Sequence, residues 1–280
     1  MASYWRLSLS GLILFLSVIQ NAYADEVITL NTGRGVRQSF LLAEPRDKPQ
    51  GVVLMFPGHE GVVKFLKEEN GYRVDHEGGG LSGKKKTIEA YRRKGLVAAV
   101  IAPPSDKEGG MSIAFRSSDE HLTDIRSVID YLRQKYDQKL YVHGHCLGTF
   151  SPASITTKLK NEGIAGMVLS STRSVSDKKH RAAVTDYQRG VVSVPVLLVQ
   201  HKQDPCPGTA YTNLVNVQHF YEESSKKVDT ILVSGGDTRQ KGIEPCKNGA
   251  HGFDGLEEKV AGAIADWILS QDFPRQIDGF

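Results

Sequence analysis

The sequence predicts an α/β fold in which helices cover both faces of a mostly parallel β-sheet. Short, continuously apolar runs alternate with amphipathic stretches, and unbroken apolar runs are typical of strands that are buried on both faces. Repetition of strand, helix and strand favours parallel pairing. The runs expected to form strands are 51–58, 96–104, 139–144, 165–171, 194–200 and 229–236, with 26–30 and 38–45 as an antiparallel pair at one edge.

The stretches between these runs predict the helices. Residues 117–136 open with a capping box, Ser117 to Glu120, and then carry apolar side chains at helical spacing. A lysine- and arginine-rich helix is expected within 83–95, with Ile88, Ala90 and Tyr91 on its apolar side. The remaining expected helices are 151–163, 211–224 and 255–271.

The first 24 residues have the pattern of a secretory signal peptide. Arg6 precedes a short apolar core at 7–19, and the small residues of 22–24 favour cleavage after Ala24. The apolar run is too short for a membrane span; a buried N-terminal helix is the alternative. We therefore expect a periplasmic or secreted protein without stable membrane association, in which residues 25–280 form a single domain.

Composition argues against several functional classes. The chain has 280 residues, 40% of them hydrophobic and 24% charged, and a formal net charge of +3. The basic residues cluster at 83–95 and 171–190, and neither cluster interleaves aromatic side chains with polar groups suited to contact bases, so no nucleic-acid partner is expected. The sequence gives no indication of the oligomeric state.

A candidate nucleophile lies between two glycines. The segment Gly144-His145-Cys146-Leu147-Gly148 follows a predicted strand and precedes a predicted helix. A nucleophile on such a turn needs small residues two positions away on each side, because strand and helix approach closely there. The unpaired N–H groups of the helix start would stabilise a thiolate. Two alternatives remain open: an inert buried thiol, or a metal site formed by His143, His145 and Cys146.

Two further residues follow in the order that a catalytic triad requires. Asp204 comes directly after the strand predicted at 194–200, and His251 lies in the loop after the strand predicted at 229–236. Nucleophile, acid and base would then follow different strands at one end of the sheet. His201 and Asp237 are competing candidates that fit the strand order less well.

The oxyanion hole is expected to use two backbone N–H groups. One belongs to Leu147, directly after the nucleophile. The other comes from the loop after 51–58, where His59 is our choice and Glu60 is the alternative donor. Neither a metal ion nor a cofactor is expected for this chemistry.

The cysteine positions agree with the proposed triad. Three cysteines in an exported protein leave one unpaired. Cys206 lies two residues after Asp204, and Cys246 lies five residues before His251. If the triad forms, these loops are neighbours, so we expect a disulfide between Cys206 and Cys246, with Cys146 as the free thiol.

These motifs resemble those of the α/β-hydrolases. GHCLG is the cysteine form of their GHSLG elbow and is similar to that of dienelactone hydrolase, whose nucleophile is also a cysteine. The stretches 102–133 and 244–268 and the QDPC loop look more like those of exported bacterial α/β-hydrolases, which usually carry serine at the elbow. The resemblance covers roughly residues 50 to 270 and implies an α/β-hydrolase fold with a Cys146–Asp204–His251 triad.

The expected activity is hydrolysis of a small-molecule ester, thioester or lactone through a thioester acyl-enzyme. A non-catalytic binding protein on a hydrolase fold is the alternative. The segment 171–190 is too short for a substantial cap domain, so little or no cap is expected. Residues 70–86 are the expected flexible rim, and Arg116 is a candidate for binding an anionic acid portion.

Overall fold

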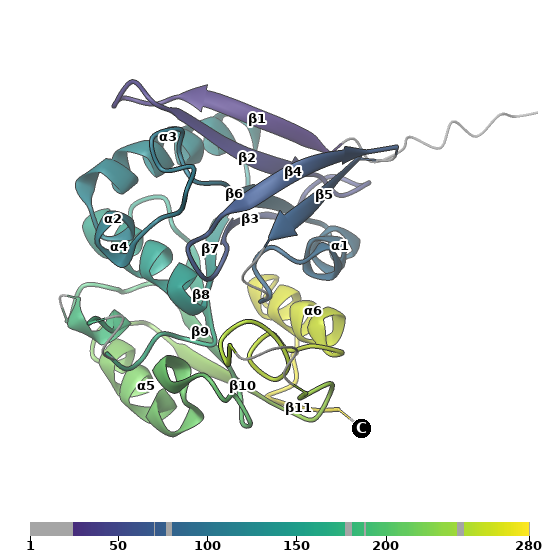
Figure 1. The fold of residues 1–280 in the computed structure, drawn as a ribbon, viewed down its shortest axis with the longest axis vertical. Helices are drawn as coiled ribbons and strands as arrows, with labels where there is room; N and C mark the ends of the chain where they lie inside the picture. Colours follow the sequence, from purple (N-terminus) through teal and green to yellow (C-terminus); the bar gives the residue numbers. More distant parts are fainter. Residues whose placement is uncertain are drawn as a thin grey trace, which may run out of the picture.

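We describe the protein from a computed structural model, in which the described residues are 25–69, 71–76, 80–176, 181–187, 189–239 and 244–279. The predicted signal peptide lies outside these residues. Figure 1 shows a central twisted sheet with helices on both sides. Within the described residues, no helix combines the length and the apolar character that crossing a bilayer requires.

The central sheet has nine strands in the order β1-β2-β6-β3-β7-β8-β9-β10-β11. Pairing is antiparallel between β1 and β2 and between β2 and β6, and parallel between all further neighbours. The strands are β1 (Glu26–Asn31), β2 (Arg37–Ala43), β3 (Gly51–Phe56), β6 (Leu96–Ile101), β7 (Leu140–His145), β8 (Gly166–Ser170), β9 (Val196–His201), β10 (Val228–Ser234) and β11 (Gln276–Asp278). The predicted mostly parallel sheet with an antiparallel edge is confirmed.

The helices form a layer on each face of the sheet. They are α1 (Lys85–Arg93), α2 (Ile113–Arg116), α3 (Asp119–Lys135), α4 (Phe150–Lys158), α5 (Leu214–Glu222) and α6 (Glu257–Ile268), with short 3₁₀ helices η1 (Cys146–Thr149), η2 (Val184–Asp186), η3 (Pro207–Thr209) and η4 (Tyr211–Asn213). Buried side chains of α3, α4 and α5 pack on one face of the sheet, and those of α1 and α6 pack on the other.

Both faces of the inner strands are buried, as the unbroken apolar runs predict. Every residue of β3, β6, β7, β8 and β9 is buried, whereas β10, next to the short edge strand β11, alternates between buried and partly exposed positions. This core fixes the carboxyl ends of β3, β7 and β9 at one edge of the sheet, where ligands of open α/β sheets bind.

The structure differs from the sequence analysis at three places. Within the expected rim at 70–86, β5 (Gly71–His76) pairs with the preceding β4 (Val63–Glu68) in an antiparallel hairpin and α1 begins at Lys85, while residues 70 and 77–79 lie outside the described residues. The capping residue of α3 is Ser118, whose hydroxyl accepts a hydrogen bond from the N–H of His121 at 3.1 Å. Ser117 instead ends α2, because a separate short helix precedes α3. The edge strand β11 was not expected at all.

Candidate active site

Cys146 lies on the sharp turn that the glycine spacing predicts. It follows β7 directly, starts η1 and has a φ of 52°, a left-handed conformation that is costly for a residue with a side chain. A Cβ atom at Gly144 would lie 2.8 Å from Cγ of Pro152, and one at Gly148 would lie 2.7 Å from the carbonyl oxygen of Pro57. At both positions neighbouring atoms lie so close to the backbone that a residue with a side chain would not fit, so glycine is required.

Gly148→Ala is accordingly expected to destabilise the protein by about 1–3 kcal/mol, because the added methyl group would press on the backbone carbonyls of Phe56 and Pro57. Gly262→Ala is the matched control. Gly262 lies inside α6, and a Cβ atom there would meet nothing within 4 Å, so this change is expected to stabilise the helix by about 0.5–1 kcal/mol. Urea unfolding of both variants measures the difference. An unchanged free energy of unfolding for Gly148→Ala would contradict the tight elbow.

His251 is hydrogen-bonded to Asp204, as the triad order predicts. Nδ1 of His251 lies 3.0 Å from Oδ1 and 3.1 Å from Oδ2 of Asp204, and both side chains are fully buried. Of the competitors, His201 pairs with the backbone, through Nε2 to the carbonyl of Gly235 and Nδ1 to the N–H of Gln203. Asp237 binds the side chain of Arg239.

The sulfur of Cys146 lies within 4.8 Å of a ring nitrogen of His251. Since Nδ1 is held by Asp204, Nε2 is the nitrogen left for the sulfur. It is buried and has no hydrogen-bond partner among the described residues. Catalytic hydrogen bonds are often long in unliganded enzymes and shorten when substrate binds. The structure thus brings Cys146, His251 and Asp204 together.

The surroundings of the two groups favour a thiolate beside an imidazolium. Burial acts to raise the pKa of the Cys146 thiol, but the charge and proximity of His251 and the N–H of Leu147 outweigh it, so the pKa is lowered. Burial acts to lower the pKa of His251, whereas the charges of Asp204 and Cys146 raise it, and the net shift is upward. Each group thus stabilises the charged form of the other.

Three groups hold the Asp204 carboxylate, and no sequence pattern indicates two of them. Oδ2 accepts hydrogen bonds from the hydroxyl of Thr209 at 2.8 Å and from Nε2 of Gln200 at 3.2 Å, and Oδ1 accepts one from the N–H of Cys206 at 2.9 Å. These donors fix the carboxylate plane toward His251. Thr209 and Gln200 are ordinary polar residues in the sequence, and only the folded loop brings them to Asp204.

The loop after β3, predicted to complete the oxyanion hole, lies against the elbow. A Cβ atom at Gly58 would come within 3.3 Å of Cβ of Cys146. His59 follows with a φ of 51°, and its ring forms an ion pair with Glu60. The backbone of Leu147 contributes to lowering the pKa of Cys146, which places its N–H near the sulfur. Both predicted donors thus come from segments that adjoin the nucleophile.

Arg116 has a different place from the one expected. Its side chain is fully buried, so it lies neither at the surface nor facing solvent, where it would meet an anion. Instead it donates hydrogen bonds to the carbonyls of Pro57 at 3.2 Å and His59 at 3.3 Å, and to the hydroxyl of Ser151 at 3.1 Å. Burial lowers its pKa to about 10, so it stays cationic at neutral pH. Arg116 therefore ties the loop after β3 to α4.

The two histidines of the elbow belong to a buried network beneath the nucleophile. His143 and His145 both lie within hydrogen-bonding distance of Oγ of Ser170, at 3.0 and 3.1 Å, and Nδ1 of His143 pairs with the hydroxyl of Tyr91. Burial lowers the pKa of both rings, which favours their neutral forms. Both rings thus have partners other than Cys146.

Within the described residues, the histidine, cysteine and acidic side chains close enough to share a metal ion are Cys146, Cys206 and His251. Cys206 is bonded to Cys246 in a disulfide, with a sequence separation of 40, and Cys146 is the free cysteine. The expected pairing of the cysteines is thus present. A sulfur in a disulfide is a poor metal ligand.

Two cavities are relevant to ligand binding. The first, of about 620 Å³, adjoins the elbow through Leu147. It is lined by Glu60, Gly109, Gly110, Met111, Ser112, Ile113, Ala114, Leu147, Arg181 and Ala182. Its wall is therefore largely apolar, with one acidic and one basic side chain.

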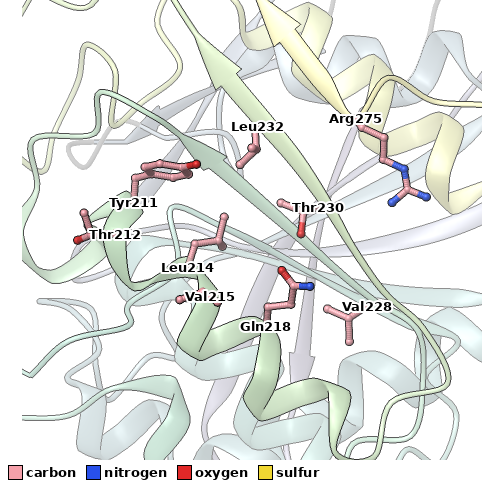
Figure 2. Close-up of a pocket in the computed structure, with 9 residues that line it drawn as sticks. All are labelled: Tyr211, Thr212, Leu214, Val215, Gln218, Val228, Thr230, Leu232 and Arg275. Carbon is pink, nitrogen blue, oxygen red and sulfur yellow. The ribbon is translucent and has the colours of Figure 1, made fainter.

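The second cavity, of about 570 Å³, lies between α5 and the outer strands (Figure 2). Its lining side chains are Tyr211, Thr212, Leu214, Val215, Gln218, Val228, Thr230, Leu232 and Arg275. None of these is a residue of the triad, so this cavity is separate from the candidate active site.

Comparison with known proteins identifies the fold. No family model and no curated protein sequence matches the chain. Solved structures do match: a dienelactone hydrolase from Anabaena variabilis (13% identity, 89% of this chain and 99% of that one, TM-score 0.58), an esterase from Pyrococcus furiosus (10%, 89% and 93%, 0.61) and a thermostable carboxyl esterase from Bacillus coagulans (12%, 88% and 98%, 0.59). The chain has the α/β-hydrolase fold, as expected.

Proposed function

We propose that this protein is a hydrolase of small-molecule carboxylic esters, thioesters or lactones, and that Cys146, His251 and Asp204 form its catalytic triad. The observation that carries the proposal is the approach of the Cys146 sulfur, on a strained left-handed turn, to a buried histidine whose other nitrogen is bound to a buried carboxylate. The structural similarity to an esterase, a carboxyl esterase and a dienelactone hydrolase supports the substrate class.

In this mechanism the thiolate of Cys146 attacks the substrate carbonyl carbon. The resulting oxyanion accepts hydrogen bonds from the N–H groups of Leu147 and His59. Collapse of this intermediate breaks the bond to the leaving group, which takes the proton from His251, and leaves a thioester on Cys146. His251 then removes a proton from water, which attacks the thioester and releases the acid.

Arg116 supports this reaction from its buried position next to the loop after β3. Its hydrogen bonds to the carbonyls of Pro57 and His59 hold the two peptide planes that flank the Gly58–His59 peptide, which carries the proposed donor N–H of His59. Its positive charge also acts on Cys146, since the electrostatic interaction between the two groups raises the pKa of Arg116. We assign Arg116 as a positioning residue for the oxyanion loop.

The cavity beside Leu147 is the proposed binding site for the acyl or leaving group. Its apolar side chains, including Met111 and Ile113, suit an aliphatic or aromatic portion. Arg181 adds a basic group to the wall. We also propose that residues 25–280 act as one exported domain; the disulfide supports an oxidising compartment.

A thioester acyl-enzyme is the intermediate that tests this proposal. Protein mixed with excess p-nitrophenyl butyrate and quenched in acid within the first turnovers is expected to gain the mass of one butyryl group. Peptide mapping is expected to place that group on Cys146, and hydroxylamine is expected to remove it. Release of p-nitrophenol without any adduct on Cys146 would contradict the triad. Absence of both release and adduct across several esters would favour a non-catalytic binding protein.

A further inference from the structure

The free thiol and the disulfide lie side by side. The sulfur atoms of Cys146 and Cys206 are within 4.8 Å of each other, and a ring nitrogen of His251 lies within the same distance of both. Cys206 is held there by Asp204, which accepts the hydrogen bond of its backbone N–H at 2.9 Å. The loop that supplies the acid of the triad thus also brings a disulfide to the nucleophile.

We propose that Cys146 undergoes reversible thiol–disulfide exchange with the bond between Cys206 and Cys246. The thiolate of Cys146 attacks the sulfur of Cys206, a Cys146–Cys206 bond forms, the Cys206–Cys246 bond breaks, and Cys246 leaves as a thiolate that takes up a proton. One disulfide and one thiol are present before and after, so no external oxidant or reductant takes part. The reverse attack, by Cys246 on Cys206, regenerates the free nucleophile.

Burial selects Cys206 as the sulfur that is attacked. Cys206 has no exposed surface and faces the nucleophile, whereas Cys246 is partly exposed. Attack on Cys206 therefore releases the thiolate of the partly exposed residue Cys246, where the negative charge is closer to solvent. Attack on Cys246 would release a thiolate inside the protein, at the cost of burying that charge.

The groups around Cys146 that favour ester hydrolysis also favour the exchange. The rate of exchange increases with the fraction of thiolate on the attacking sulfur, and His251 stabilises that thiolate. The two sulfur atoms lie within 4.8 Å of each other, and side-chain rotation has to bring them to the length of a disulfide bond, about 2.05 Å. The exchange requires only the sulfur atoms of the three cysteines and the base His251. It is a reaction additional to the proposed hydrolysis.

The consequence is a second chemical state of the protein. With its sulfur bonded to Cys206, Cys146 has no thiolate, and Cys246 carries the free thiol at the surface. An exported protein of this kind would switch between a form with a reactive thiol in the active site and a form with a reactive thiol outside it. Small disulfides such as oxidised glutathione could react with the second form at Cys246, forming a mixed disulfide and releasing one molecule of the reduced thiol.

Disulfide mapping of the wild-type protein tests the exchange directly. The folded protein is held at pH 5, 7 or 9, quenched in acid to stop exchange, digested in acid and analysed by mass spectrometry without reduction. We expect two linked peptide pairs, one joined through Cys146 and Cys206 and the other through Cys206 and Cys246. The ratio of the two pairs is expected to reach equilibrium at least about tenfold faster at pH 9 than at pH 5, because the rate of exchange increases with the fraction of thiolate. Exclusive recovery of the Cys206–Cys246 pair at every pH would overturn the proposal.

Two single variants give an independent measurement. Cys246→Ser leaves Cys146 and Cys206 as thiols, and with oxidised glutathione these are expected to form one internal disulfide, with loss of two hydrogen atoms and reduction of the glutathione. In the matched control, Cys206→Ser, the thiols that remain are Cys146 and the more distant, partly exposed Cys246. We expect their internal disulfide to form at least about tenfold more slowly than in Cys246→Ser, and glutathione adducts to form in its place. Equal rates, or adducts alone in both variants, would overturn the proposal.

The wild-type mapping does not depend on whether the variants fold, and circular dichroism shows whether they do. Every one of these experiments measures a mass, and none uses an ester. A negative result for the exchange therefore leaves the proposed hydrolysis unaffected, and a negative result for hydrolysis leaves the exchange unaffected.

Discussion

Replacing Cys146 with alanine is expected to lower kcat/KM for p-nitrophenyl ester hydrolysis by about 10⁴-fold or more. The change removes the atom that attacks the carbonyl, and the triad leaves no other nucleophile at the elbow. The stability effect is expected to be small, because alanine keeps the Cβ atom on the strained turn and the elbow glycines remain. Initial rates with acetate and butyrate esters measure the loss.

Cys146→Ser is the informative companion variant. A hydroxyl group at this position keeps the shape of the side chain, but it does not form an anion beside His251 at neutral pH. We expect activity between those of wild type and Cys146→Ala, since histidine must then act as a general base toward the hydroxyl. Hydrolysis by Cys146→Ala at the wild-type rate would show that the chemistry occurs elsewhere.

Asp204→Asn is expected to cause the second large loss, about 10⁴-fold in kcat/KM. Asparagine keeps the size of the side chain but removes the negative charge that faces Nδ1 of His251 at 3.0 Å. The amide also cannot accept all the hydrogen bonds now donated by Thr209, Gln200 and the N–H of Cys206. We expect an additional destabilisation of about 1–3 kcal/mol from the broken buried network.

The direction of the pH effect separates the electrostatic role of Asp204 from a purely structural one. Because the carboxylate raises the pKa of His251, its removal is expected to lower the pKa of the histidine toward its ordinary value and to move the pH profile of kcat/KM with it. Asp237→Asn is the matched control: Asp237 pairs with Arg239 and is not among the charges that raise the pKa of His251, so its replacement is expected to leave both rate and profile unchanged. A pH profile unaltered by Asp204→Asn would argue against the assigned acid.

The parts of the protein that the sequence predicts correctly are those that depend on local pattern. Unbroken apolar runs locate the strands of the buried sheet. Cys146 and Asp204 come just after strands, and His251 lies in the loop that follows β10, so all three come to one edge of the sheet. The hairpin of β4 and β5 was missed although its signal is present. Phe65 and Val74 alternate with charged residues, and both pack against the core, but adjacent glycines and lysines favoured a loop.

Residues whose role depends on distant contacts could not be predicted in this way. Arg116 has the sequence surroundings of a surface residue, and only the packing of α2 between the loop after β3 and α4 buries its guanidinium group. The same holds for Thr209, which reaches Asp204 because η3 turns back on the strand end. A single sequence shows which side chains can carry chemistry, but their supporting partners come from the tertiary fold.

The disulfide has a consequence for the chain when it is unfolded. Asp204 lies two residues before Cys206 and His251 five residues after Cys246. The bond therefore shortens the covalent path between them from 47 residues to these two short segments and the disulfide. In the denatured ensemble the carboxylate and the imidazole therefore remain tethered at close range. On this account α5, β10 and the loops around them belong to a closed ring, and the acid–base pair needs little conformational search to form again.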